Sequence, residues 1–411
     1  MRKKTSQIYV VHIITSLAAD GAGTMLYRIL AHTNRSHYYP VVISLDDDNG
    51  SADKIRAHGI PVHCLNMANS LTSGWHILRL VRLLRELEPD VIQGWMYHGN
   101  LAASIANLAL SNRHPVFWNI RQSLYDITLE STAMQWAIRL SAKRSGKPTG
   151  IIYNAYRAAE QHADFGFKEN NAHIIPNGFD THVFAPNAYS RETIRHSLAI
   201  PQEAFVIGMV ANYHPMKNHA LFLEAANLLN KHQKNVHFIL TGREITHENR
   251  EIQQLLKRFP ALQANLHLTG ERQDIPAILN ALDVFTLTSS YGEGFSNVVG
   301  EAMACGVPCI ATDVGDVPRI IGNTGHILRD ASPSALAFAW LEWINAGATW
   351  RDEQGQRAMQ RIKRHYSIHN IAHQYQELYA SATQEIRTSE TALAHVGMKK
   401  FSSNISMNRL A

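Results

Sequence analysis

The sequence predicts an α/β protein made of two successive halves, each a doubly wound parallel sheet with helices on both faces. Its 411 residues are 45% hydrophobic, which is enough to fill more than one core. Short β-branched runs alternate with segments of helical spacing, as in βαβ units. This alternation stops near residue 186 and then starts again. The strand ends of the two halves are expected to line a cleft between them.

The first half opens with a continuous apolar run at 8–14, typical of a strand buried on both faces. A glycine-containing turn at 20–23, a helix at 25–30 and a strand at 39–44 complete a βαβ unit. The other elements expected here are strands at 62–65, 91–92, 116–118 and 150–153, with a helix at 75–87. An Asn-Gly pair at 177–178 predicts a structural turn between the domains.

The second half repeats the pattern. Its expected elements are strands at 205–210, 236–240, 266–268, 283–287 and 307–311, with a helix at 218–229. We place the first domain at 1–182 and the second at 183–367, with a linker near 177–190. A terminal helix at 368–386 is expected to pack back on the first domain, and 387–411 to form a flexible tail.

Charge and cysteine usage narrow the function classes. The formal net charge of +5 is a mild excess that does not indicate a nucleic-acid partner. It suits an anionic small substrate or an anionic membrane surface. Of the three cysteines, Cys305 and Cys309 are expected to be buried packing residues, and none has partners at zinc spacing. Without a signal peptide or an apolar run of about 18 residues, the protein is expected in the cytoplasm.

The stretch 290–308 places two carboxylates around a predicted helix start. Glu293 lies in a turn between two glycines, and Glu301 lies one or two turns into the following helix. A carboxylate can accept hydrogen bonds from two vicinal hydroxyls, such as those of ribose or a pyranose. For an arbitrary pair, however, a surface glutamate and a helix-stabilising glutamate are the favoured interpretation.

The helix start between the two acids can bind an anion. Ser296 is a suitable N-cap, and Gly306 with Pro308 ends the helix near Cys305. The groups expected to face a donor are Gly294, Phe295, Ser296, Asn297 and Val298. Of these, the amides of residues 295–298 are predicted to lack partners. A nucleoside-diphosphate sugar would fit, with its ribose at one acid, its diphosphate at the helix start and its hexose at the other acid.

The run 292–308, continuing through 311–316, resembles the glutamate-x7-glutamate signature of the family 4 (group 1) retaining glycosyltransferases. The similarity extends over about residues 8–385 and includes segments 93–100, 118–121, 175–180, 208–217, 268–276 and 281–283. It implies the GT-B fold, with two Rossmann-like domains facing a deep cleft. It also implies transfer of a hexose or N-acetylhexosamine from a nucleotide-diphosphate sugar to a glycan or lipid-linked acceptor. Anomeric configuration would be retained, without a bound metal or cofactor.

In the second domain, Lys217 matches the family's phosphate-binding lysine. Asn212 stands five positions earlier, where the family usually carries arginine. Asparagine can donate a hydrogen bond but brings no charge. Either Arg243 or Arg272 is expected to supply the missing cation, or donor turnover is weaker.

In the first domain, His98 matches a histidine close to the transferred sugar, and the resemblance groups it with Lys217 and Glu293 as catalytic residues. Arg121 follows a strand end and is expected to contact acceptor or phosphate, with a salt bridge as an equal alternative. Gly21 belongs to a loop that matches the family's first-domain glycine loop in position. There the backbone would approach the diphosphate.

The resemblance implies a mechanism without an enzyme nucleophile. The acceptor hydroxyl would attack the anomeric carbon on the face that the diphosphate leaves, and a departing phosphate oxygen would take the proton. Glu293 would then position the sugar. The pathway implied is bacterial surface polysaccharide or lipopolysaccharide synthesis.

Rival functions stay open. A nicotinamide oxidoreductase is disfavoured because Leu26 stands where the dinucleotide fingerprint needs its third glycine. A retaining glycosidase would use the two glutamates directly, at about 5–5.5 Å separation. A non-catalytic nucleotide-sugar-binding homologue is suggested by Asn212. Peripheral membrane contact through 77–85 and 139–147 would suit a lipid-linked acceptor, although a packed helix with a solvated basic edge is favoured.

Overall fold

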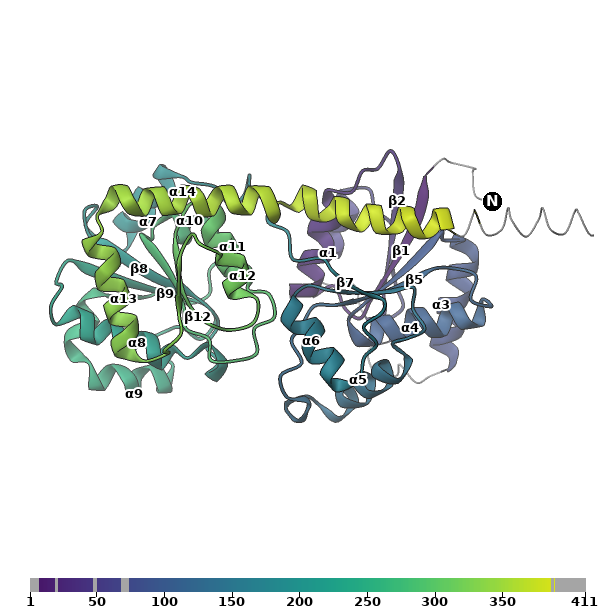
Figure 1. Ribbon diagram of the computed structural model, residues 1–411, viewed down its shortest axis with the longest axis horizontal. Coiled ribbons are helices and arrows are strands. Elements are labelled where there is room, and N and C mark those ends of the chain that lie inside the picture. Colours follow the sequence, from purple (N-terminus) through teal and green to yellow (C-terminus); the bar gives the residue numbers. More distant parts are fainter. Residues whose placement is uncertain (1–6, 19–20, 47–49, 68–73, 386–387, 389–411) are drawn as a thin grey trace, which may run out of the picture.

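The structure of the protein, a computed structural model, describes residues 7–18, 21–46, 50–67, 74–385 and 388. It contains two α/β domains that lie side by side along the long axis (Figure 1). Each domain is built on one parallel sheet. The predicted fold class, two Rossmann-like domains of the GT-B type, is confirmed.

The first domain has a seven-stranded sheet of order β3-β2-β1-β4-β5-β6-β7. Its strands are β1 (Ile8–Ile14), β2 (Tyr38–Ser44), β3 (Val62–Cys64), β4 (Val91–Trp95), β5 (Val116–Ile120), β6 (Gly150–Tyr153) and β7 (Ala172–Ile174). Its helices are α1 (Gly21–Ala31), α2 (Ala52–Ala57), α3 (Gly74–Leu87), α4 (Met96–Ala109), η1 (Ile127–Leu129), α5 (Thr132–Arg144) and α6 (Tyr156–Phe165). At the centre, Val11 of β1 pairs with Val41 on one side and Ile92 on the other.

The second domain has a six-stranded sheet of order β10-β9-β8-β11-β12-β13. Its strands are β8 (Phe205–Val210), β9 (Val236–Thr241), β10 (Leu266–Leu268), β11 (Val284–Leu287), β12 (Cys309–Thr312) and β13 (His326–Leu328). Its helices are α7 (Ala188–Ser197), η2 (Pro215–Lys217), α8 (His219–Asn230), α9 (Arg250–Arg258), η3 (Pro260–Asn265), α10 (Ile275–Asn280), α11 (Asn297–Ala304), α12 (Val317–Ile321), α13 (Pro333–Asn345) and α14 (Ala348–His365).

The apolar runs become buried strands because helices cover both faces of each sheet. In the first domain, α1 and α2 share one core with the sheet, and α3, α4 and α5 share the core on its other face. Cys305 and Cys309 of the second domain are buried, as predicted. Burial raises the pKa of the Cys305 thiol to about 12, so this thiol is protonated and inert at neutral pH.

The structure corrects the turn predicted at 20–23. Residue 20 lies outside the described residues, and Gly21 and Gly23 form the first turn of α1. A Cβ atom added to Gly23 would lie 2.5 Å from the carbonyl oxygen of Ala18. Glycine at this position therefore lets the helix pack directly on the preceding backbone, which is why the helix begins earlier than its apolar spacing indicates.

After α14 the chain returns to the first domain. A helix over residues 368–385 lies along that domain, on the face that carries α1 and α2 (Figure 1). Ile371, Tyr375 and Tyr379 are buried in the shared core. The Tyr38 hydroxyl donates a hydrogen bond of 2.9 Å to the carbonyl of Gln376. The tail predicted at 387–411 lies outside the described residues, apart from residue 388.

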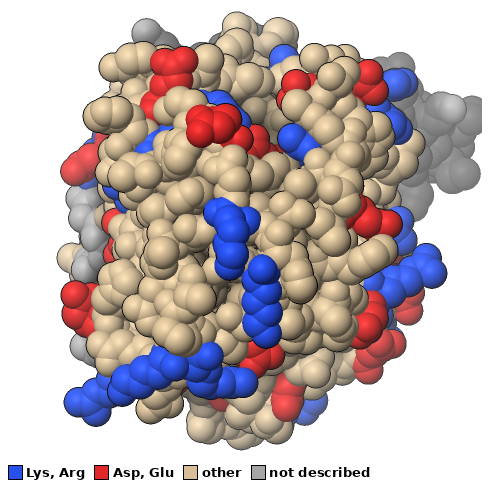
Figure 2. Space-filling view, turned by 90° about the vertical axis from the view of Figure 1, so that its left-hand side faces the viewer, with Lys and Arg blue, Asp and Glu red and all other residues tan. Residues whose placement is uncertain are grey.

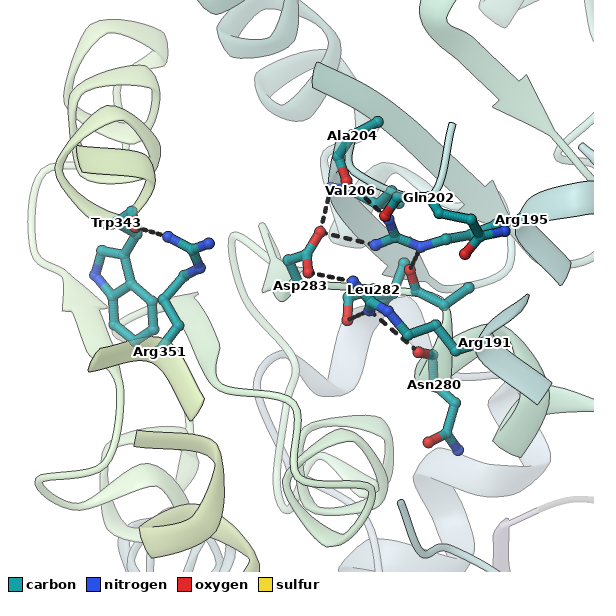
Figure 3. A network of polar contacts seen from close by, with 11 residues as sticks. Arg191, Arg195, Gln202, Ala204, Val206, Asn280, Leu282, Asp283, Trp343 and Arg351 are labelled. Carbon is teal, nitrogen blue, oxygen red and sulfur yellow. Dashed lines mark hydrogen bonds and ion pairs between the residues drawn. The ribbon is translucent and has the colours of Figure 1, made fainter. Parts of the chain in front are cut away.

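A buried polar network fixes α7 to the second sheet (Figure 3). Arg195 is fully buried, and its Nη2 lies 2.8 Å from Oδ2 of Asp283. Arg191 contacts the other carboxylate oxygen at 2.7 Å, and the Val206 amide also donates to Asp283. Arg195 further donates to the carbonyl oxygens of Ala281, Gln202 and Ala204. This network attaches the first helix after the interdomain connection to the starts of β8 and β11.

The outer end of the second domain carries charges of both signs (Figure 2). On the outer end of the second domain, Lys and Arg side chains lie among Asp and Glu on a mostly uncharged surface (Figure 2). Among the described helices, none is both long and apolar enough to cross a membrane.

Candidate active site

The site forms around the start of α11, which begins where the sequence predicts. Ser296 occupies the N-cap position with its backbone extended, but its hydroxyl makes no capping hydrogen bond. Within the described part of the chain, no hydrogen bond is donated by the amides of Phe295, Ser296, Asn297 or Val298. A helix start with open donors and a positive dipole end is a ready site for phosphate.

Glu293 and Lys217 are in direct contact beside this helix start. Glu293 is 8% exposed, and its Oε1 accepts from Nζ of Lys217 at 2.5 Å and from the hydroxyl of Ser289 at 2.7 Å. Lys217 ends the short helix η2 after β8, and Thr288 donates to its carbonyl oxygen at 2.8 Å. Two predicted catalytic residues, 76 positions apart in the sequence, therefore meet at the carboxyl ends of adjacent strands.

The turn that carries Glu293 is held from the far side by the loop after β12. Gly315 has a φ of 53°, and an added Cβ atom would lie 2.2 Å from the carbonyl oxygen of Glu293. Only glycine allows this approach. The Asp316 amide then donates to the carbonyl of Gly294 at 2.9 Å. The backbone around the carboxylate is thus fixed by contacts rather than left as a free loop.

Glu301, the second acid, is held by a cation from the other domain. Nη2 of Arg28 in α1 lies 3.0 Å from Oε1 of Glu301, and their side chains are 19% and 12% exposed. The Arg28 guanidinium also lies 5.7 Å from the ring centroid of Phe184 in the interdomain connection. The sequence analysis missed Arg28, because no local pattern links an arginine on α1 to an acid 273 residues away.

The two arginines proposed to replace the charge missing at Asn212 differ in their surroundings. Oδ1 of Asn212 accepts from the amide of Arg243 at 2.9 Å, so these two residues are neighbours. Arg243 is exposed, and its side chain makes no hydrogen bond or ion pair with another described residue. Arg272 instead forms a two-point contact with Asp274, at 2.7 and 2.5 Å. Arg243 is therefore the freer cation.

His98 lies in the first turn of α4 and is half-buried. Its burial lowers the pKa of the imidazole, which favours the neutral form at neutral pH. The preceding Tyr97 contacts His162 Nε2 at 2.7 Å, and His162 Nδ1 lies 2.6 Å from the carbonyl of Ala158. A carbonyl can only accept, so Nδ1 carries the proton and the Tyr97 hydroxyl donates to Nε2. This pair anchors the turn that presents His98.

Arg121 lies in a network of neutral partners and forms no ion pair with a described residue. Its Nη1 donates to Asn119 at 3.2 Å and to the hydroxyl of Tyr375 at 2.9 Å, and its Nη2 donates to Oδ1 of Asn177. Nδ2 of Asn177 in turn donates to Oδ1 of Asn297 at 2.5 Å, at the start of α11. Among the described residues the salt bridge offered as an alternative is not present, and Arg121 links the C-terminal helix to the site.

Two further contacts join the domains near Glu293. The Asp316 carboxylate accepts from the amides of Tyr156 and Arg157 at 2.8 and 2.9 Å, so a second-domain acid caps α6 of the first domain. Tyr125 and Tyr291 stack across the interface with ring centroids 5.0 Å apart. The sequence analysis missed these residues as well, since a cap supplied by another domain leaves no local signature.

In the part of the chain that the structure describes, no group of three or more His, Cys, Asp or Glu side chains is placed to hold a metal ion. The site described above is built instead from backbone amides, two carboxylates and their cations.

Two facing Rossmann-like domains with this paired-acid helix start define a class of sugar-transferring enzymes, and comparison with known proteins agrees. The family model described as "Glycosyltransferase Family 4" matches residues 19–183. The family model described as "Glycosyl transferases group 1" matches residues 204–346. The two matches fall on the two domains. The chain belongs to the family 4, group 1 glycosyltransferases of the GT-B fold, as the resemblance predicted.

Individual relatives support this assignment. EpsF of Bacillus subtilis (strain 168), named as a glycosyltransferase, is 29% identical over 372 residues, 84% of this chain and 88% of that protein. An Escherichia coli enzyme named UDP-Gal:alpha-D-GlcNAc-diphosphoundecaprenol alpha-1,3-galactosyltransferase is 34% identical over 153 residues, 36% of this chain but only 38% of that enzyme.

Solved structures share the fold. The structure of Anabaena Alr3699/HepE in complex with UDP aligns with a TM-score of 0.78 and 20% identity, over 91% of this chain and 100% of that one. The same protein in complex with UDP-glucose aligns over the same shares, with a TM-score of 0.74 and 21% identity.

Proposed function

We propose that this glycosyltransferase moves a hexose or N-acetylhexosamine from a nucleoside-diphosphate sugar to a glycan or lipid-linked acceptor, with retained anomeric configuration and no bound metal. The observation that carries the proposal is the contact between Lys217 and Glu293 beside the open amides of α11. A cation and a helix start supply positive potential for a diphosphate, and the adjacent acid supplies an acceptor for sugar hydroxyls.

The donor would lie along α11. Its diphosphate meets the amides of residues 295–298 and the ammonium of Lys217. Glu301 accepts from the ribose hydroxyls, and Glu293 accepts from hydroxyls of the transferred sugar. The relatives favour a uridine nucleotide, since one was solved with UDP-glucose and another is named for UDP-galactose. The latter's name includes a diphosphoundecaprenol-linked sugar, which supports a lipid-linked acceptor for this chain. We further propose that the product enters bacterial surface polysaccharide or lipopolysaccharide synthesis.

In the proposed reaction, the acceptor hydroxyl oxygen bonds to the anomeric carbon on the face that the diphosphate leaves. The bond from that carbon to the phosphate oxygen breaks, and its electron pair goes to the phosphate. A departing phosphate oxygen takes the hydroxyl proton. Lys217 and the α11 amides neutralise the charge that develops on the leaving group. We assign to His98, at the start of α4, the orientation of the sugar or the acceptor, a role that the neutral imidazole favoured by its burial would suit.

A role for Glu293 as a glycosidase nucleophile is less well supported. Its Oε1 accepts from both Lys217 and Ser289. Glu301 is paired with Arg28 from the other domain. Each acid therefore has its own cation, which fits two separate binding roles better than one shared hydrolytic step.

The test is a screen of nucleoside-diphosphate sugars, read out as released nucleotide, on the wild type and on Lys217→Ala. We expect the substitution to lower the turnover of the accepted donor by about 100-fold or more, because one transition-state donor is lost. Lys231→Ala, an exposed lysine after α8, is the matched control and should leave turnover unchanged. Equal rates for wild type and Lys217→Ala, with both proteins folded, would remove the site assignment.

A further inference from the structure

The helices α4 and α5 form an unusually basic surface with no acidic residues. The segments 96–114 and 131–149, which contain these helices and their following loops, include no Asp or Glu. They carry the cations Arg113, Arg139, Lys143, Arg144 and Lys147. All five are exposed, and none forms an ion pair with another described residue. These two segments therefore carry five positive charges and no negative one.

Large apolar side chains are exposed on the same two helices. Trp136 is 68% exposed and Leu108 is 59% exposed. Ile105 and Leu140 are each 41% exposed. Trp136, Leu140 and Arg144 follow one another at spacings of four, so they form one stripe along α5, apolar at its start and basic at its end. Scattered apolar residues are ordinary on a surface, but a contiguous group marks an interaction site.

This stripe borders a groove of about 500 Å³ between α4 and α5. Ile105, Leu108 and Leu140 line its apolar part, and Arg144 and Lys147 line its basic part. The groove lies on the face of the first sheet opposite the helix 368–385 (Figure 1), so the C-terminal helix does not cover it. Apolar and cationic groups thus lie side by side on one open surface.

We propose that the α4–α5 face, defined by these apolar residues and the five cations, docks on an anionic phospholipid bilayer. Tryptophan and leucine side chains suit the boundary between headgroups and acyl chains, and each lysine or arginine near the surface attracts anionic lipid. A protein partner of matching charge would need carboxylates beside apolar groups in one fixed arrangement. An anionic lipid surface offers negative headgroups beside apolar acyl chains everywhere, so no specific arrangement of groups is needed.

The face is connected to the active site by α4 itself. His98 lies in the first turn of this helix, and Leu108 lies in its last turn, in the groove. At about 1.5 Å per residue, the two positions are about 15 Å apart along the axis. Docking would therefore hold His98 and the start of α4 close to the membrane. This inference goes beyond the proposed function and does not depend on which donor is used.

The test is sedimentation of the full-length protein with vesicles, at low salt. We expect binding to vesicles of phosphatidylglycerol and phosphatidylcholine, and little binding to phosphatidylcholine alone. The variants Arg144→Glu/Lys147→Glu and Trp136→Ser/Leu140→Ser should each weaken binding by about tenfold or more. All four side chains are exposed, so the variants are expected to fold, and thermal unfolding checks this. Nucleotide release from the donor should stay at the wild-type rate.

Matched controls lie on the second domain. Lys231→Glu/Lys257→Glu reverses two exposed lysines there, and Phe338→Ser removes an apolar side chain that is 60% exposed. Both should bind vesicles like the wild type. The proposal is overturned if the wild type stays in the supernatant, or if the face variants bind as tightly as the wild type. It is also overturned if the controls lose as much binding. A last outcome would also overturn the proposal: sedimentation velocity shows that the wild type is a dimer and that the face variants are monomers, while the wild type binds no lipid.

Discussion

At the level of single residues, the site depends on which cations are engaged by acids and which are open to a ligand. Lys217 contacts Glu293 at the helix start, and Arg28 contacts Glu301 from the other domain. A phosphate that binds here gains charge-assisted hydrogen bonds, which are stronger than neutral ones. Asn212 stands where the family usually carries arginine, so one such charge is missing here and a neighbouring arginine becomes important.

We expect Arg243→Ala to raise the KM for the nucleotide sugar by about tenfold or more, the value of one hydrogen bond between charged groups. Arg243 adjoins Asn212 and has an unengaged side chain among the described residues, whereas Arg272 is held by Asp274. Steady-state kinetics on donor hydrolysis measures the effect. Arg272→Ala is the matched control and should change KM much less. A larger effect of Arg272→Ala would assign the missing charge to Arg272 instead.

The sequence predicted those site residues that lie close together in one short stretch of the chain. Ser296 as N-cap and the acids at 293 and 301 follow from turn and helix chemistry over a few positions. Arg28, Asp316 and the stacked Tyr125 were missed. Their partners come from the other domain, and no periodicity or spacing along the chain encodes such a contact.

At the level of helices and strands, most parallel strands were predicted correctly. Short continuous β-branched runs are typical of strands that are buried on both faces of a parallel sheet. The strands at 150–153 and 205–210 lie where the sequence placed them. The start of α1 was not predicted. Glycine is read as a turn signal, but Gly23 is required by close packing on Ala18 inside a helix. Tertiary packing overrode the local signal at this position.

The attachment of α7 gives a prediction about stability. Asp283→Ala should lower the free energy of unfolding by about 3 kcal/mol or more, because it leaves the buried guanidinium of Arg195 without its counter-ion. Chemical denaturation followed by circular dichroism measures this. Asp164→Ala, at an exposed position of α6, should stay within about 0.5 kcal/mol of the wild type. Similar midpoints for the two variants would show that the network does not stabilise the second domain.

At the level of the whole molecule, the two domains meet through polar and aromatic contacts that surround the α11 start. The ion pair from Arg28 to Glu301, the cap from Asp316 to α6 and the bond from Asn177 to Asn297 all cross the interface. The helix at 368–385 ties the end of the chain to the first domain. The start of α11 is thus supported from both domains. Of the two acids near it, Glu293 is paired within its own domain and Glu301 is paired across the interface.

A crystal structure of the full chain with its accepted nucleoside-diphosphate sugar tests the central claim most directly. The account predicts diphosphate oxygens within hydrogen-bond distance of the amides of residues 295–298 and of Nζ of Lys217. It also predicts ribose hydroxyls at Glu301 and hydroxyls of the transferred sugar at Glu293. A diphosphate bound away from the start of α11, or a donor that touches neither glutamate, would contradict it.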